Sequence, residues 1–261
     1  MKKNISTIIC LVIFLWFGLL SYFQYQQSQK EIVRNRFLEN KSLADFFILW
    51  KSFSRTKEAL TNPLSVKIMN SKDFDVSDTK IATEQMEKLL KKIWWMDILV
   101  LSAWTWQDNF NLDFDIEYET IKTNIIGRTN IIDWATKYFI KQWFWHIVAI
   151  TSIASLRGIW WCPSYNATKA YQSNYIESLR LNIDKRELPI KILEVQPWFI
   201  NTRMAQWNLF WVCPVPKASK QILQAIEKWK KHIYVSKKWR LFAWIIKISP
   251  YKIYKKIVNW L

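Results

Sequence analysis

A tyrosine and a lysine in the motif "YNATK" have the spacing needed for proton-transfer chemistry. Tyr165 and Lys169 are four residues apart, so on a helix they lie on the same face. A lysine ammonium beside a phenol favours the phenolate and lowers the tyrosine pKa from about 10. Tyr165 could then exchange a proton near neutral pH. Ser152, 13 positions earlier at the end of an apolar run, offers a hydroxyl to the same substrate oxygen.

A parallel sheet would bring these three residues together. Apolar runs that alternate with helical segments predict βαβ units, and hence an α/β, Rossmann-like, doubly wound parallel sheet with flanking helices. Polar residues follow the strands, at the carboxyl edge where such sheets bind ligands. We expect strands at residues 65–69, 97–101, 146–152 and 190–197, and helices at residues 41–48, 81–93, 116–139 and 165–186.

The motifs together resemble the short-chain dehydrogenase/reductase family over roughly residues 30–247. "ITSIAS" and "YNATK" look like the family's Ser-Tyr-Lys site, and Asn124 in "TNIIG" matches its fourth catalytic position. By this resemblance Tyr165 is the general acid/base and Ser152 orients the substrate carbonyl. Lys169 holds the nicotinamide ribose, and Asn124 maintains a water relay for protons. The implied reaction passes a hydride between the nicotinamide and a carbonyl or alcohol carbon.

The same resemblance implies the cofactor-binding positions. "LSAW" is similar to the family's Asn-Asn-Ala-Gly strand end, "PWFINT" to Pro-Gly-x-x-x-Thr, and "DFDVSD" to the acidic-apolar pair that contacts adenine. A cation at Arg55 resembles the NADP-preferring pattern because it can pair with a 2′-phosphate, so NADP is expected and NAD is possible. A surface arginine at a helix start is the alternative. The implied cofactor-binding residues are Arg55, Asp75, Val76, Ser102, Ala103, Trp104, Tyr165, Lys169, Pro197, Ile200 and Thr202.

Tryptophan and glycine occur in unusual numbers. The chain has 18 Trp and 3 Gly, whereas typical usage of about 7% would give roughly 18 Gly. Trp also stands where glycine is wanted, as at Trp104 after one strand and Trp198 after Pro197. We predict that many of these Trp are UGA codons that the organism reads as Gly; a truly Trp-rich protein is the alternative. Trp239 and Trp244 are expected to be genuine, because an indole suits an amphipathic basic segment.

The glycine-rich turn with which the family holds the pyrophosphate is missing. It should follow the first strand, "KEIV", and present backbone N–H groups at a helix N-terminus. Residues 34–40, "RNRFLEN", contain neither Gly nor Trp, so codon reassignment does not explain them. We therefore predict two compensating frameshifts across this stretch. In the frame as read, side chains would take up the space of the pyrophosphate.

The N-terminus has the features of a membrane anchor. The apolar run from Ile5 to Phe23 is 19 residues long, just enough to cross a bilayer, and no small-residue cleavage site follows it. A buried strand-helix pair is the alternative. We expect an apolar transmembrane helix at 1–25, a Rossmann-type catalytic domain at 26–216 and a basic amphipathic helical extension at 217–261.

The net charge of +17 is concentrated in that extension. From Lys217 onward, 12 Lys and Arg stand against one acid, Glu227. Apolar residues alternate with the lysines, which favours a membrane surface as partner over nucleic acid; a solvated helix face is the alternative. The three cysteines form no CxxC pair and suit a reducing compartment. We expect a membrane-associated protein with a cytoplasmic catalytic domain.

Two functions are compatible with these patterns. The first is an NADP-preferring oxidoreductase that interconverts a small, lipophilic carbonyl and its alcohol; the resemblance implies a homodimer or homotetramer through the helices that hold Asn124 and Tyr165. The second applies if Trp104, Trp198 and residues 34–40 are genuine. The chain would then lack a proper cofactor site and would be a degenerate binding or scaffold protein at the membrane surface. The two histidines lie far apart and make no metal site.

Overall fold

The computed structural model describes residues 47–50, 66–69, 75–93, 96–142, 145–201 and 211–260. The predicted anchor at 1–25, the stretch 34–40, Arg55 and Thr202 lie outside the described residues. Within them, no helix is both long and apolar enough to pass through a bilayer.

Among the described residues, six strands form one sheet in the order β2-β1-β3-β4-β5-β6. The predicted parallel sheet is confirmed for β3, β4, β5 and β6. β1, where no strand was expected, runs antiparallel to both of its neighbours. Since β2 and β3 both oppose β1, they run in the same direction, and α2 still crosses between them. The strands are β1 (Phe47–Trp50), β2 (Val66–Met69), β3 (Ile98–Leu101), β4 (Trp145–Ile150), β5 (Ile190–Gln196) and β6 (His232–Tyr234).

The helix predicted at residues 41–48 is wrong at its last two residues, which are the part of it that the structure describes. Phe47 and Ile48 belong to β1, whose backbone pairs with strands on both sides. The apolar run "FILW" suits a strand with a neighbour on each side as well as it suits a buried helix.

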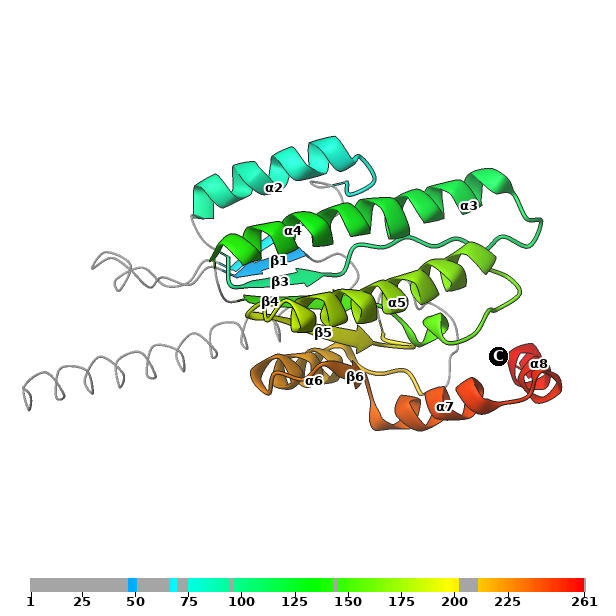
Figure 1. Cartoon of the computed structure of the whole chain (residues 1–261). Coiled ribbons are helices and arrows are strands. Elements are labelled where there is room, and N and C mark those ends of the chain that lie inside the picture. Colours follow the sequence, from blue (N-terminus) through cyan, green and yellow to red (C-terminus); the bar gives the residue numbers. More distant parts are fainter. Residues whose placement is uncertain are drawn as a thin grey trace, which may run out of the picture.

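Helices cover both faces of the sheet (Figure 1). Side chains alternate along the strands: Leu99 and Ile147 face a core under α2, α4 and α5, while Val100 and Val148 face a second core under α6. The helix from 114 to 142 is one rod interrupted by a π-helical turn. The elements are α2 (Thr79–Ile93), α3 (Phe114–Ile121), η2 (Lys122–Gly127), α4 (Arg128–Gln142), α5 (Pro163–Lys185) and α6 (Val215–Glu227).

The C-terminal region differs from the predicted extension at 217–261. That boundary falls inside α6, and β6 pairs with β5 as the last strand of the sheet. Two helices follow β6, α7 (Lys237–Ile248) and α8 (Tyr251–Trp260). Figure 1 shows them at the end of the molecule toward which the arrows of β3 and β5 point.

Candidate active site

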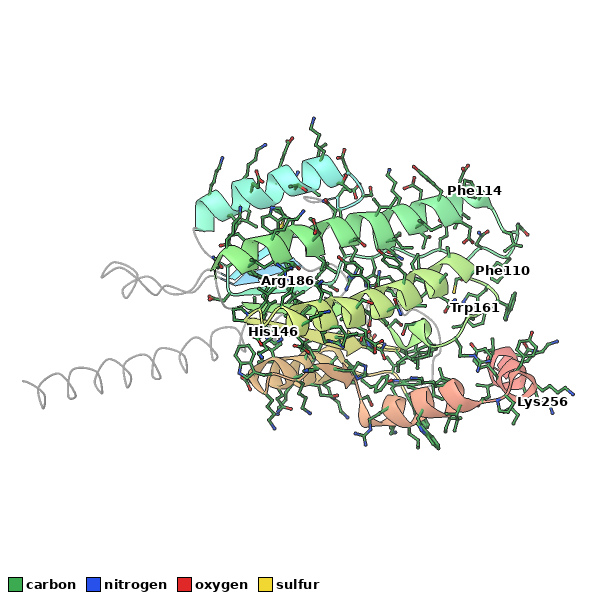
Figure 2. All side chains as sticks on the ribbon, in the orientation of Figure 1. Phe110, Phe114, His146, Trp161, Arg186 and Lys256 are labelled. Atoms are coloured by element: carbon green, nitrogen blue, oxygen red, sulfur yellow. The ribbon has the colours of Figure 1, made fainter. Side chains whose placement is uncertain are left out.

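The predicted site residues gather at the carboxyl edge of the sheet. Ser102 follows β3, Ser152 follows β4 and Pro197 follows β5. The hydroxyl-bearing residues Ser102 and Ser152 are buried there. In Figure 2, Phe110 and Trp161 mark this end of the molecule, and His146 marks the opposite one.

Val76 packs against the π-helical turn η2. A Cβ on Gly127 would come within 2.3 Å of the Val76 carbonyl oxygen, so only glycine fits at this contact between η2 and the chain after β2. The Asp75 carboxylate accepts hydrogen bonds from the backbone and hydroxyl of Ser77, at 2.8 and 2.9 Å. Ile200, which follows β5, is buried and forms an isolated parallel β-bridge with Cys213.

Ser152, Tyr165 and Lys169 come together as predicted from their spacing. Ser152 precedes η3 (Ile153–Ser155), and its hydroxyl accepts a hydrogen bond from the Ala154 N–H at 3.1 Å. Tyr165 and Lys169 lie on the first turns of α5 and face the same way, with the ammonium 5.5 Å from the centre of the phenol ring. Lys169 is completely buried and donates to Gln172 Oε1 at 3.3 Å.

The pKa shifts differ from the predicted activation of the tyrosine. Burial raises the pKa of the Tyr165 hydroxyl, and a hydrogen bond with Ser152 offsets only part of that rise. Burial lowers the pKa of Lys169 well below its ordinary value, and the Arg128 guanidinium lowers it further. Burial therefore favours the uncharged form of both groups, which weakens the predicted activation of Tyr165 by Lys169.

Asn124 lies in the π-helical turn η2 and is fully buried. Its side chain ties down the loop after β3, accepting from the Thr105 N–H and donating to the Thr105 carbonyl, both at 2.8 Å. The backbone carbonyl of Asn124 accepts a hydrogen bond from Gln172 Nε2 at 2.8 Å. Gln172 therefore joins Lys169 to the Asn124 carbonyl, where the resemblance implies a water relay. Such π-turns often occur at functional sites.

Arg128 is a buried cation one residue beyond η2. Its Nη1 donates to the carbonyls of Leu101 and Ala103, at 3.2 and 3.4 Å. Its Nε and Nη2 find no hydrogen-bond partner within the described part of the chain. Burial lowers its pKa to about 9, with Glu194 acting weakly the other way. Arg128 and Lys169 thus bring two buried basic side chains together at the edge of the site.

Two indoles cover Tyr165, the predicted catalytic tyrosine. The ring of Trp104 lies 5.7 Å from the ring of Tyr165, centre to centre, and that of Trp106 lies 6.0 Å from it. The Lys169 ammonium lies 4.9 Å from the centre of the Trp104 ring. The side chain of Trp104 therefore fills the volume over Tyr165 and Lys169.

A polar cleft of about 360 Å³ lies elsewhere, between α5 and β6. Ser155, Glu194, Gln196 and His232 line it, and the four predicted catalytic residues do not. Gln196 donates to Ser155 and Glu194 and lies 3.1 Å from His232 Nε2. Because these groups bond to one another, the cleft is a satisfied polar network beside the site.

Sequence reasoning missed three residues that support the site. Gln172 could have been found, because it shares a helix face with Tyr165 and Lys169 at a spacing of seven and three. Thr105 acts through its backbone, which leaves no signal in a side-chain pattern. Arg128 was missed because arginines are almost never fully buried without a charged partner.

Comparison with known proteins gives the family. The family model described as short chain dehydrogenase matches residues 51–209, more than half of the chain. The protein therefore belongs to the short-chain dehydrogenase family.

Its relatives are distant. An uncharacterized oxidoreductase of Myxococcus xanthus is 24% identical over 146 residues, covering 55% of this chain and 56% of the relative. Dehydrogenase/reductase SDR family member 7B of Danio rerio is 23% identical over 134 residues, covering 51% and 43%. The chain thus spans about half the length of these relatives.

Solved structures share the fold. A short chain dehydrogenase from Burkholderia cenocepacia, in complex with NADP, superposes with a TM-score of 0.60 at 16% identity, covering 70% of this chain and 76% of its own. ElxO with NADP bound gives a TM-score of 0.56 at 22% identity, covering 62% and 75%. At these identities the likeness establishes the Rossmann-like fold.

Proposed function

We propose that the protein is an NADP-preferring oxidoreductase, able also to use NAD, that interconverts a carbonyl and an alcohol. The observation that carries the proposal is the meeting of Ser152, Tyr165, Lys169 and Asn124 at the carboxyl edge of a parallel sheet. NADP-bound neighbours of the same fold support the choice of cofactor.

Each side chain has one task in this proposal. The Tyr165 hydroxyl gives a proton to the substrate oxygen or takes one from it. The Ser152 hydroxyl donates a hydrogen bond to the same oxygen and orients it. Lys169, when charged, lowers the pKa of Tyr165. Asn124 positions the loop after β3 through Thr105.

The site fits the charge of the cofactor but not its ring. The buried Arg128 guanidinium, two of whose nitrogens have no hydrogen-bond partner among the described residues, suits a phosphate-bearing ligand. A nicotinamide beside Tyr165 would need the volume that the Trp104 indole fills. With Trp at position 104, the nicotinamide does not fit.

We infer that the natural protein carries glycine at position 104 and at other positions read as Trp. Support comes from the backbone. Trp211 and Trp229 have φ of 53° and 51°, in the left-handed region that favours glycine. Trp229 also ends α6 in a Schellman motif, donating to Ile226 while Lys230 donates to Ala225, and glycine is the preferred residue at that place.

Two further expectations remain proposals. The frameshift across residues 34–40 would restore a pyrophosphate-binding turn, and resequencing that finds the frame intact would exclude it. A dimer or tetramer would cover apolar side chains exposed on the two helices that hold Asn124 and Tyr165. These side chains are Tyr118, Ile121, Ile126, Tyr171 and Leu181.

The scaffold alternative is favoured by the same indoles if they are genuine. A site filled by Trp104 and Trp106 would bind no cofactor and would leave Tyr165 neutral. The two functions therefore predict opposite results when position 104 carries a small residue: the oxidoreductase binds NADPH, and the scaffold protein does not.

NADPH fluorescence titration separates them. We compare the chain with Trp at both positions, called the standard-code chain, with W104G/W106G. Both proteins carry a glycine-rich turn in place of residues 34–40, so that the pyrophosphate has room in each. We expect the double variant to bind NADPH and the standard-code chain to bind at least about tenfold more weakly, because the indoles occupy the site. A folded double variant that binds no NADPH would contradict the proposal.

Tyr165→Phe, made in the double variant, is the matched control. It should keep NADPH binding and lose reduction of a lipophilic aldehyde such as decanal by roughly two to four orders of magnitude, because the proton donor is gone. Unchanged turnover would assign the proton transfer to another group.

A further inference from the structure

The outer face of α7 and α8 carries a stripe of exposed apolar side chains. Leu241, Ile245 and Ile248 recur at helical spacing on α7, and 61% of Leu241 and 58% of Ile248 are exposed. Tyr251 and Ile253 add two exposed apolar side chains on α8, with 72% and 53% exposed. The other face of α7 is held in the protein by Trp239, which is completely buried.

Positive charge surrounds this stripe. No acidic residue occurs from 237 to 261. The exposed basic residues of the two helices are Lys238, Arg240, Lys247, Lys252, Lys255 and Lys256. Two copies of the face would repel each other, so a second copy of this chain is disfavoured. The partner must be both apolar and negatively charged over a wide area.

We propose that α7 and α8 dock on an anionic lipid bilayer. The apolar stripe enters the acyl boundary, and the lysines lie at the headgroups, as in amphipathic helices that bind in the plane of a membrane. Figure 2 shows Lys256 on α8 at the periphery of the molecule, clear of the sheet. Trp244 is also exposed, but the face stays apolar and basic without it.

Docking would reach the active site through the loop between Ser152 and Tyr165. Arg157 on this loop donates to the carbonyls of Ile246 and Ser249, at 3.3 and 2.9 Å. Its guanidinium lies 4.2 Å from the centre of the Tyr254 ring, and the Tyr254 hydroxyl donates to the Gly158 carbonyl at 2.7 Å. The turn between α7 and α8 is thus bonded to the loop.

These contacts place the membrane face next to the substrate side of the site. Both helices lie at the carboxyl end of the sheet, as Figure 1 shows. A bilayer held there would present a lipophilic substrate at the loop beside Ser152. The docking itself does not depend on the proposed oxidoreductase activity, and it is tested without any substrate.

Hydrogen exchange of the full chain with lipid vesicles tests the docking. We compare phosphatidylcholine vesicles with vesicles that also contain phosphatidylglycerol. Phosphatidylglycerol should slow exchange of backbone amides in 241–256 and in 153–162, and high salt should reverse the effect. Binding through the predicted N-terminal anchor would form a background that lipid charge does not change. No protection of 241–256 on anionic vesicles would overturn the proposal.

Surface variants identify the face. I245S/I248S should weaken the charge-dependent binding by on the order of tenfold, because two apolar side chains no longer enter the bilayer. Ile81→Ser on α2 is the matched control and should change nothing, because Ile81 is 49% exposed, between Ile245 at 39% and Ile248 at 58%, and lies far from α7 in the sequence. Equal binding by I245S/I248S and the unaltered chain would reject these helices as the docking surface.

Arg157→Gln tests the coupling. It should leave vesicle binding and protection of 241–256 unchanged but reduce the protection of 153–162. Full protection of that loop in the variant would show that docking does not act through Arg157.

Discussion

The two ends of the sheet each hold a buried base against an indole. At the carboxyl end, Lys169 lies under Trp104, and burial lowers the lysine pKa. At the amino end, His146 in β4 stacks on Trp229 with ring centres 5.1 Å apart, and burial lowers the histidine pKa to about 4. Both ends pair a buried base with an indole, but the reason why glycine suits the position of the indole differs between them.

The difference lies in the backbone. Trp229 has a left-handed φ of 51°, so its position favours glycine whatever surrounds it. Trp104 is not among the left-handed residues of the described chain, and there the argument for glycine is the volume over Tyr165. Glycine suits position 229 because of its backbone conformation, and it suits position 104 because it leaves space over Tyr165.

The largest effect is expected at the amino end, from His146. Its folded pKa of about 4 lies below the unfolded value of 6.5, so the unfolded state takes up the proton first as the pH falls. Stability is fully present above about pH 6.5 and is lost as the pH falls toward 4, by roughly 3 kcal/mol. Urea denaturation at a series of pH values measures this loss.

Two variants sharpen that result. His146→Leu should remove this part of the pH dependence. Trp229→Gly should make it smaller, because a histidine without the indole is better solvated. A pH dependence that is equal in His146→Leu and the unaltered chain would mean that other groups cause it.

A smaller effect is expected from the backbone at position 229. Trp229→Gly and Trp229→Ala both remove the indole, but only glycine relieves the left-handed strain. The free energy of unfolding of the glycine variant should therefore be higher by about 1 kcal/mol. Position 187 is a matched site: Glu187 ends α5 in the same motif with a φ of 51°, and its Gly-Ala pair should show the same difference.

Position 104 should behave differently. There the glycine and alanine variants should agree within about 0.5 kcal/mol, because the backbone is not left-handed. Equal Gly-Ala differences at 104 and 229 would remove the distinction between the two ends.

Much of the fold could be predicted from apolar patterning. β3, β4, β5 and α5 begin and end within a few residues of the predicted positions, because unbroken apolar runs mark buried strands. The direction of β1 could not be predicted, since a four-residue apolar run carries no sign of its orientation. β6 was missed because its three residues, "HIY", are too few to show the apolar run or the alternation that marks a strand.

The structure brings Ser152, Tyr165 and Lys169 to one edge of the sheet, since strand ends and helix faces fix their positions. Their catalytic roles stay predictions. Their pKa values could not be predicted, because they depend on burial under Trp104 and on the neighbouring Arg128. The cofactor residues Arg55 and Thr202 lie outside the described residues and remain predictions.

The central claim is that positions 104 and 229 are glycines in the natural protein and that glycine at position 104 leaves the active site open. Peptide mass spectrometry of the protein isolated from its own organism tests this most directly. The account predicts peptides with the mass of glycine at both positions. Peptides with the mass of tryptophan at both would contradict it and would favour the scaffold function.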